Sequence, residues 1–237
     1  MKLRPTVLTL LAVATLAATA IAQDAITVQV GDRPTVSLAP FSGPDGDEAT
    51  RVCEQDLRIQ GFKIVGSGGQ YLVRGEITGA GLNATCSSAT GSAIVSKTYK
   101  GPLRQAAHQF SDEVVKAVTG HPGIATSKIA FVCDKSGRKE IYLSDYDGHN
   151  ARWITNDKSI NVGPRFSRDG QFIVYTSYRK GFPDVILHRL ASKDRKAVAA
   201  FPGTNTGAAI SLDGTEIALS ASKFGNPELV VIPLEGG

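Results

Sequence analysis

Two segments of the sequence pair an aspartate with a glycine in a way that could either bind a metal ion or turn the chain. Residues 167–170 and 211–214 both read Ser-x-Asp-Gly, and each precedes a run of β-branched and other apolar residues. Glycine tolerates a positive φ, and aspartate can accept hydrogen bonds from the backbone that follows it, so this pair is typical of a tight turn before a strand. We interpret Asp169 and Asp213 as turn residues, with metal binding as the alternative.

Three further patterns contain residue types that could support chemistry, but each lacks a required partner. Residues 145–150 (DYDGHN) resemble the start of a calcium loop, yet the twelfth position, which should be Glu, is Asn156. Residues 79–84 (GAGLNA) fit a dinucleotide fingerprint, yet the residues that follow them are poor helix formers. Both segments are predicted to be hairpin turns, and His108, which lies off the apolar face of an expected helix, is predicted to be solvated or capped. The sequence therefore predicts no catalytic residue, no cofactor and no metal site.

The Ser-x-Asp-Gly segments belong to a repeat with a period of 44 residues, since 211 − 167 = 44. The same offset places three glycines in one column and three acidic residues in the next, and each acidic residue opens an apolar run. A period near 44 residues, with β-branched strands between turns, is typical of a propeller blade of four strands. The aligned residues are Gly137, Gly181 and Gly225, followed by Glu140, Asp184 and Glu228.

The first residues have the pattern of a secretory signal peptide. A short basic region is followed by an apolar one, and Ala20-Ile21-Ala22 fits a signal-peptidase site. We therefore expect cleavage after Ala22 and export to the periplasm of a mature chain that begins at Gln23, with an uncleaved membrane anchor as the alternative. The formal net charge of +4 is spread without a basic stripe, which argues against a nucleic-acid partner.

Residues 23–124 lack the repeat and alternate between strand patterns and two amphipathic helices. Helices are predicted over residues 45–61 and from 103 to 119, and strands over residues 35–41, 62–65, 71–78, 82–88 and 92–101. The predicted fold class is α+β, with a signal peptide (1–22), a small N-terminal α/β domain (23–124) and an incomplete all-β propeller (125–237) of about two and a half four-stranded blades. Cys133 is predicted to be a buried free thiol, whereas Cys53 and Cys86 could pair with each other or remain free.

Several phrases of the sequence resemble the TolB family, whose members are periplasmic components of the Tol–Pal envelope system. They are VSLAPF (36–41), the stretch 106–132 that spans the junction of the two predicted domains, SDYDGHN (144–150) and residues 199–214. The resemblance covers essentially the whole chain after residue 23, but Arg168 and Leu212 stand where the family's turns usually carry proline. A propeller of the family's six blades needs about 6 × 44 residues, so the resemblance also implies a fragment or a truncated product.

The resemblance implies a non-enzymatic adaptor in the cell envelope. In the family, the propeller binds the lipoprotein Pal and the mature N-terminal segment engages TolA of the inner membrane. The protein then reaches the outer membrane only through its partners, and it supports outer-membrane integrity, cell division and protein translocation. Two alternatives are the N-terminal propeller of a secreted prolyl-peptidase-like hydrolase and a propeller that binds a small ligand. The hydrolase would need a Gly-x-Ser-x-Gly nucleophile segment, which this sequence lacks.

The family's contact positions fall in two regions of this sequence. Thr204 and Asn205 lie in the loop FPGTNTG, and Asn161 shares a repeat column with Asn205, since 205 − 161 = 44. The resemblance implies that Thr204 and Asn205 contact a Pal-like lipoprotein, and the repeat extends this expectation to Asn161. Their polar, glycine-rich loops are expected to be exposed. Ordinary turn chemistry is the alternative for the two asparagines. The contact with a TolA-like protein would comprise Gln23, Asp24, Ala25 and Ile26.

Overall fold

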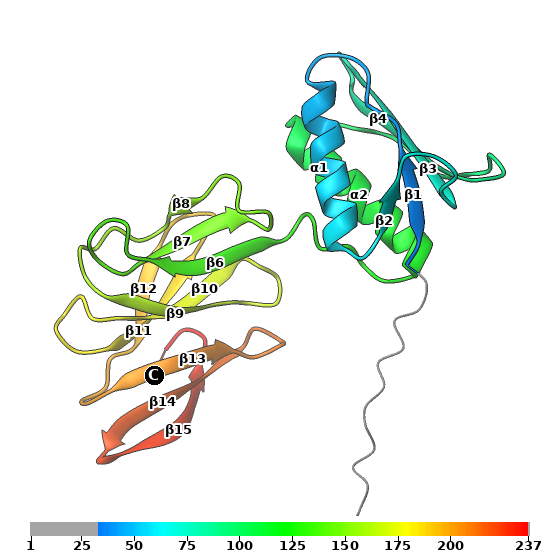
Figure 1. The fold of residues 1–237 in the computed structure, drawn as a ribbon. Helices are drawn as coiled ribbons and strands as arrows, with labels where there is room; N and C mark the ends of the chain where they lie inside the picture. The colour runs from blue at the N-terminus through cyan, green and yellow to red at the C-terminus, as the bar shows by residue number, and fades with distance from the viewer. Residues whose placement is uncertain (1–32, 237) are drawn as a thin grey trace, which may run out of the picture. The chain divides into compact units, whose positions relative to one another are not determined.

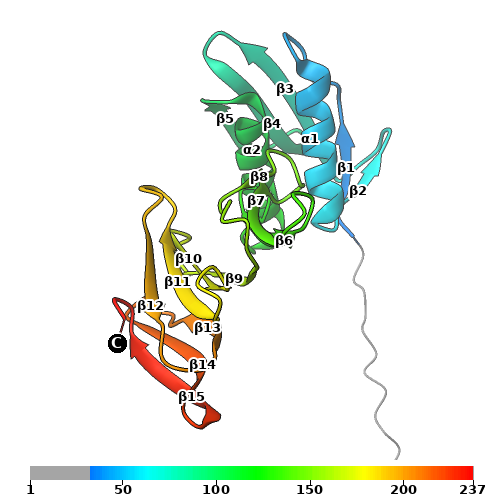
Figure 2. The same ribbon diagram turned by 90° about the vertical axis from the view of Figure 1, so that its left-hand side faces the viewer.

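In the computed structural model, which describes residues 33–236, the first part of the chain forms a five-stranded sheet with two helices on one face (Figures 1 and 2). Helix α1 (Gly46–Ile59) connects β1 to β2, which is why these two neighbouring strands can run parallel. The later strands are joined by hairpins and run antiparallel. In the order β2-β1-β3-β4-β5, the strands are Lys63–Val65, Thr35–Leu38, Tyr71–Thr78, Gly81–Ser88 and Ala93–Tyr99.

The core of this first part lies between the sheet and the two helices. The apolar face predicted for α1 is buried, and so is the corresponding face of α2 (Leu103–Thr119), which ends at Gly120 with a φ of 77°. These side chains pack against the inward-facing residues of the sheet, such as Val36 and Val73. The predicted helices and strands of this region, with the helices covering one face of the sheet, are confirmed.

The remaining strands form three antiparallel sheets of three, four and three strands (Figure 1). The repeat predicts their positions to the residue: β6, β7 and β9 shifted by 44 give β10, β11 and β13. The predicted fold, an incomplete propeller of blades with this period, is confirmed, because the sheets succeed one another without closing a ring. The sheets comprise β6 (Lys128–Cys133), β7 (Glu140–Asp145) and β8 (Arg152–Trp153); β9 (Asn161–Phe166), β10 (Phe172–Ser177), β11 (Asp184–Arg189) and β12 (Arg195–Ala199); and β13 (Asn205–Ile210), β14 (Glu216–Phe224) and β15 (Asn226–Pro233).

The middle sheet is buried on both faces, as its strand β10 illustrates. Ile173 and Tyr175 pack with Ile141 of the preceding sheet, whereas Val174 packs with Ile217 of the following sheet. Successive side chains of a strand point to opposite faces, so this alternation shows how one blade joins its two neighbours. Each boundary between sheets is therefore a separate small apolar core.

The outer sheets are less covered than the middle one. Strand β6 pairs only with β7 among the described residues, and its equivalent β10 pairs on both edges. As a result Cys133 in β6 is only partly buried, so the prediction that it would be a buried thiol is wrong. The other two cysteines are buried and free, which resolves the open question of their pairing in favour of two thiols. On the last strand, Leu229 is 80% exposed.

The two motif segments that suggested chemistry form hairpin turns, as predicted. The dinucleotide-like segment joins β3 to β4, with Thr78 opposite Gly81. The calcium-like segment joins β7 to β8, where the backbone N–H of Gly148 donates to the carbonyl of Asp145 at 2.9 Å. No helix within residues 33–236 is both long and apolar enough to cross a lipid bilayer.

The segment between α2 and β6 is tied back to the helices by one carboxylate. Asp112 of α2 accepts hydrogen bonds from the backbone N–H groups of Ala125 and Thr126, at 2.7 and 2.9 Å, and from the Thr126 hydroxyl at 2.7 Å. In addition, Gln60 accepts a bond from the N–H of Ile124 at 2.8 Å. The chain therefore enters the first propeller strand in a defined position relative to α2.

Candidate partner-binding site

Asn205 opens β13 and is completely buried. Its side-chain amide donates to the carbonyl of Phe201 at 2.8 Å and to the carbonyl of Pro183, in the preceding blade, at 3.2 Å. The side chain thus closes the loop that precedes β13 and links that loop to its neighbour. The expectation that this loop exposes Asn205 is wrong, because the side chain points into the junction between two blades.

Asn161 holds the equivalent place in the blade before and is also completely buried. Its amide donates to the carboxylate of Glu140 at 2.8 Å, and its backbone N–H donates to the carbonyl of Lys139 at 2.8 Å. Glu140 also accepts bonds from the Thr155 hydroxyl and from the N–H of Lys158. The expected exposure is therefore wrong here too. Asn205 bonds to the backbone of its own loop, as the turn alternative expects, whereas Asn161 bonds to a side chain 21 residues away.

Thr204 is the accessible member of the three predicted contact residues. Its N–H donates to the Ser222 hydroxyl at 2.7 Å, and its own hydroxyl donates to the same oxygen at 3.1 Å. Gly203 has a φ of +89°, and a Cβ atom there would lie 2.1 Å from the Ser222 oxygen, so glycine is needed for this close approach. The structure thus places Thr204 on a surface that the buried Asn205 and the turn at Ser222 hold in shape.

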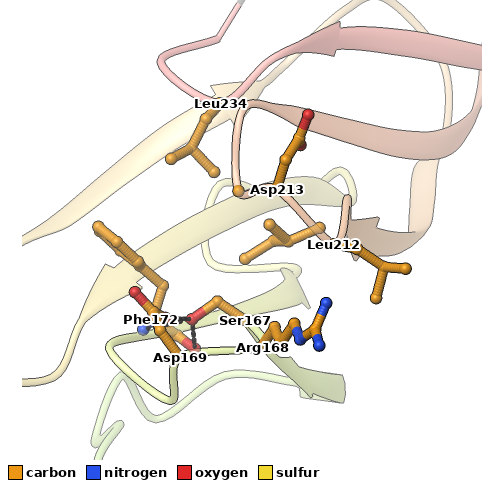
Figure 3. A pocket seen from close by; sticks show the side chains of 9 residues that line it. Ser167, Arg168, Asp169, Phe172, Leu212, Asp213 and Leu234 are labelled. Carbon is orange, nitrogen blue, oxygen red and sulfur yellow. Dashed lines mark hydrogen bonds between the residues drawn. The ribbon is translucent and has the colours of Figure 1, made fainter.

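The two Ser-x-Asp-Gly turns lie at the end of the blades opposite to Thr204. They line a common hollow between two sheets (Figure 3). Asp169 accepts bonds from the Ser167 hydroxyl at 2.5 Å and from the N–H of Gln171 at 3.0 Å. Asp213 makes the equivalent bonds with Ser211 and Thr215. The prediction that both aspartates are turn residues is confirmed. The Ser167 hydroxyl, followed by the Gln171 N–H, holds the pKa of Asp169 below its ordinary value.

Replacing Gly170 with valine is expected to lower the free energy of unfolding by about 1–3 kcal/mol. Gly170 has a φ of +69° with no other atom within 4 Å of an added Cβ, so backbone strain alone sets the cost. Asparagine at the same position should cost less, because it tolerates this conformation. Urea unfolding of the purified variants measures the difference.

Gly66 is the matched control, since an added Cβ there is equally free of contacts and its φ is not positive. Gly66→Val should change stability by no more than about 0.5 kcal/mol. An equal loss at both positions would mean that valine itself, and not the turn conformation, is responsible.

A second polar cluster is buried where α1 and α2 meet the hairpin between β7 and β8. Asp56 of α1 is 1% exposed and accepts bonds from Nδ1 of His108 at 2.9 Å and from the hydroxyl of Tyr146 at 2.6 Å. Burial, together with the Asp56 carboxylate, raises the pKa of Tyr146, so its hydroxyl remains a donor. Arg104 of α2 forms an ion pair with Asp147 of the hairpin. The prediction of a solvated or capped His108 is wrong: the side chain is buried and paired.

Sequence reasoning missed this cluster because its members are far apart in the chain. Asp56 and Tyr146 are separated by 90 residues, and Asp56 and His108 by 52. The available signal was that Asp56 follows Cys53 by three residues and so falls on the buried face of α1.

The residues implied for a TolA-like contact, Gln23 to Ile26, and the predicted signal peptide lie outside the described residues.

The sheets and their turns define a β-propeller of 44-residue blades that follows an α/β layer. Residues 115–237, about half of the chain, match the family described as PD40, the TolB beta propeller domain. The chain belongs to the TolB family.

Named relatives agree with this assignment. The Tol-Pal system protein TolB of Desulfosudis oleivorans is 44% identical over 115 residues, which cover 47% of this chain and 26% of the relative. The Protein TolB homolog of Chlorobium chlorochromatii is 33% identical over 184 residues, covering 74% of this chain and 41% of the relative. The chain therefore spans less than half the length of these two relatives.

A solved structure has the same fold. The crystal structure of TolB from Acinetobacter baumannii superposes with a TM-score of 0.77 at 24% sequence identity. The match covers 86% of this chain and 58% of that one, so it includes both the α/β layer and the propeller sheets. At this identity the likeness shows the fold alone.

Proposed function

We propose that the chain is a non-enzymatic periplasmic adaptor of the Tol–Pal system and binds a Pal-like lipoprotein through the end of the propeller that carries Thr204. The observation that carries the proposal is an exposed loop held in shape by buried side chains, in a propeller of the TolB family. A rigid surface of this kind favours binding, because little conformational freedom is lost when the partner docks.

The carboxylates that could have served as catalytic groups are hydrogen-bonded within the protein, and this supports an adaptor over an enzyme. The carboxylates of Asp169 and Asp213 are engaged by their own turns, and Asp56 is engaged by His108 and Tyr146. The adaptor needs no cofactor. Its contact with the partner comes from shape and hydrogen bonding at the Thr204 loop, which Asn205 supports from below the surface.

The remaining parts of the proposal concern residues 1–32 and the biological role. Cleavage after Ala22 would deliver the protein to the periplasm, where the segment from Gln23 to Ile26 binds a TolA-like inner-membrane protein. Contact with the outer membrane is made only through the partners. The adaptor supports outer-membrane integrity, cell division and protein translocation.

Replacing Thr204 with tryptophan is expected to weaken binding to a purified Pal-like lipoprotein at least tenfold, which corresponds to about 1.4 kcal/mol. The indole adds bulk without charge at the exposed loop, where it would hold the two surfaces apart. The melting temperature should hardly change, because exposed substitutions rarely alter stability by more than about 0.5 kcal/mol. Titration calorimetry and thermal melts measure the two quantities.

Thr90 provides the matched control for this experiment. It is also an exposed threonine whose hydroxyl contacts a serine hydroxyl, that of Ser88 at 2.8 Å, but it lies in the loop between β4 and β5. Thr90→Trp should bind the lipoprotein as the unchanged chain does. Equal affinities for the Thr204 and Thr90 variants would remove the Thr204 loop from the interface, and no binding by the unchanged chain would refute the proposed function.

A further inference from the structure

Three equivalent turns, one from each blade, carry a basic residue at the same position. They join β6 to β7, β10 to β11 and β14 to β15, and in each the glycine N–H donates to the carbonyl three residues before it, at 2.7, 2.9 and 3.0 Å. The second residue of the turn is Lys135, Arg179 or Lys223, and all three are exposed. The positive charge is therefore repeated with the period of the fold itself.

The same turns contain further cations, and each turn is followed directly by an acidic residue, of which Glu140 and Asp184 are buried and Glu228 is exposed. Over residues 134–139, 178–183 and 222–227 there are six basic residues and one acidic residue, Asp134. Among the ion pairs of residues 33–236, the six take part in one, between Arg179 and Asp157 at 4.0 Å, and the Arg179 side chain there is 68% exposed. We call these six residues the basic ridge: Lys135, Arg138, Lys139, Arg179, Lys180 and Lys223.

All three turns lie at the same end of their sheets. The strands are antiparallel, so the turns after β6, β10 and β14 are at one end and the Ser-x-Asp-Gly turns are at the other. The hairpin between β7 and β8, which contacts α1 and α2 through Tyr146 and Asp147, belongs to the second end. The basic ridge is thus at the end away from these contacts.

The basic ridge is continuous with the Thr204 loop. The N–H of Ser222, next to Lys223, donates to the carbonyl of Thr204 at 3.0 Å. The ammonium group of Lys223 lies 4.1 Å from the centre of the Phe201 ring, in the same loop. In the preceding blade, the N–H of Tyr178, next to Arg179, donates to the carbonyl of Ile160 at 2.9 Å. Lys223 therefore borders the Thr204 loop directly, and Arg179 borders the equivalent loop of the preceding blade.

We propose that the basic ridge binds a carboxylate-rich protein surface, and that it speeds and orients docking of the partner on the Thr204 loop. This inference rests on the proposed function and adds the chemistry of the partner's surface. Cations at the rim of an interface mainly raise the association rate and make it sensitive to salt. Two ridge turns also expose an aromatic ring, of Phe182 and Phe224, each 73% exposed, which suits a protein partner because aromatic residues and arginine are enriched at such interfaces.

The test removes one cation from each turn. The triple variant Lys135→Gln, Arg179→Gln and Lys223→Gln is compared with the unchanged chain for binding to a lipid-free Pal-like lipoprotein, by stopped-flow kinetics. At about 20 mM salt the association rate constant should fall about tenfold. At about 300 mM salt the two rate constants should lie within about twofold, because the charges are screened. The dissociation rate constant should change little.

A second triple variant, Arg152→Gln, Arg168→Gln and Lys193→Gln, controls for total charge. These three cations are exposed at or near the opposite end of the blades. This variant loses the same three charges, so its association rate constant should stay within about twofold of the unchanged chain at both salt concentrations. An equal loss in both triple variants would overturn the basic ridge in favour of a general effect of net charge.

The remaining outcomes separate this inference from the proposed function. If the ridge variant keeps the association rate and salt dependence of the unchanged chain while Thr204→Trp still weakens binding, the ridge is overturned and the function stands. If the unchanged chain does not bind the lipoprotein, both fail. Ridge-dependent binding to phosphatidylcholine vesicles with about one third phosphatidylglycerol, together with ridge-independent binding of the lipoprotein, would overturn the inference in favour of a lipid surface.

Discussion

Replacing Asn205 with aspartate is expected to lower the free energy of unfolding by about 3–5 kcal/mol, a loss large enough to unfold part of the population at room temperature. The amide of Asn205 donates to two backbone carbonyls, of Phe201 and Pro183, in a site closed to water. A carboxylate at this place would face both carbonyl oxygens without a proton to donate. Urea unfolding of the purified variant measures the loss.

The loss should depend on pH in a defined direction. Burial next to two carbonyl oxygens raises the folded-state pKa of the introduced carboxyl above the value of about 3.9 in the unfolded chain. The folded state then binds the proton more tightly, so the variant should recover part of its stability as the pH falls from 8 toward 5. Even when protonated, the carboxyl can donate to only one of the two carbonyls, so recovery should be incomplete.

Asn226 offers the same chemical change at an exposed strand start. It opens β15 as Asn205 opens β13, but its side chain is accessible to solvent. Asn226→Asp should therefore cost no more than about 0.5 kcal/mol at any pH in this range. If the Asn205 variant were as stable as the Asn226 variant, the two hydrogen bonds to Phe201 and Pro183 would not support the loop.

The contrast between Asn205 and its neighbour Thr204 shows what the sequence could and could not predict about the site. A loop that reads FPGTNTG is polar and rich in glycine, so composition predicts exposure for all its side chains. Composition does not say which side chain turns inward where a strand begins against a neighbouring blade. The structure exposes Thr204 and buries Asn205, although the two are adjacent. Equivalence with Asn161 was visible in the repeat, and this suggests a role in the blade itself for both residues.

The fold could be predicted further than the site because the repeat constrains it. A shift of 44 residues maps β6, β7 and β9 onto β10, β11 and β13 without a gap, so each blade confirms the strands of the next. Contacts that occur once in the chain have no such support. The pairing of His108 with Asp56 depends on how α2 packs against α1, and the bond from Tyr146 depends on where the first blade docks. Neither relation leaves a periodic trace in the sequence.

Replacing Asp56 with alanine is expected to destabilise the protein by about 2–4 kcal/mol. Removal of the carboxylate leaves the Tyr146 hydroxyl and Nδ1 of His108 buried without their partner, and each unpaired group costs about 1–3 kcal/mol. Trp153, the one tryptophan of the sequence, stands in β8 close to the hairpin that carries Tyr146, so its fluorescence during urea unfolding reports on the first blade. Far-UV circular dichroism of the same samples reports on α1 and α2.

Glu54 is the control on the same helix. Its carboxylate pairs with Arg58 at 2.6 Å on the solvent-facing side of α1, where an ion pair contributes less than about 1 kcal/mol. Glu54→Ala should therefore leave the urea midpoint nearly unchanged. A similar small effect for Asp56→Ala would contradict the view that the buried cluster holds the helices against the first blade.

The hydroxyl of Tyr146 allows a sharper test of the same contact. Tyr146→Phe removes only the donor and should cost about 1 kcal/mol, since the aromatic ring and its packing remain. If the bond of 2.6 Å between Tyr146 and Asp56 carries the link, the two changes should not add, because either one removes it. The double variant should then be more stable than the sum of the two single losses predicts, by about 1 kcal/mol. Strict additivity would mean that Tyr146 and Asp56 stabilise the protein independently, which would leave His108 and the ion pair of Arg104 with Asp147 to hold the hairpin against the helices.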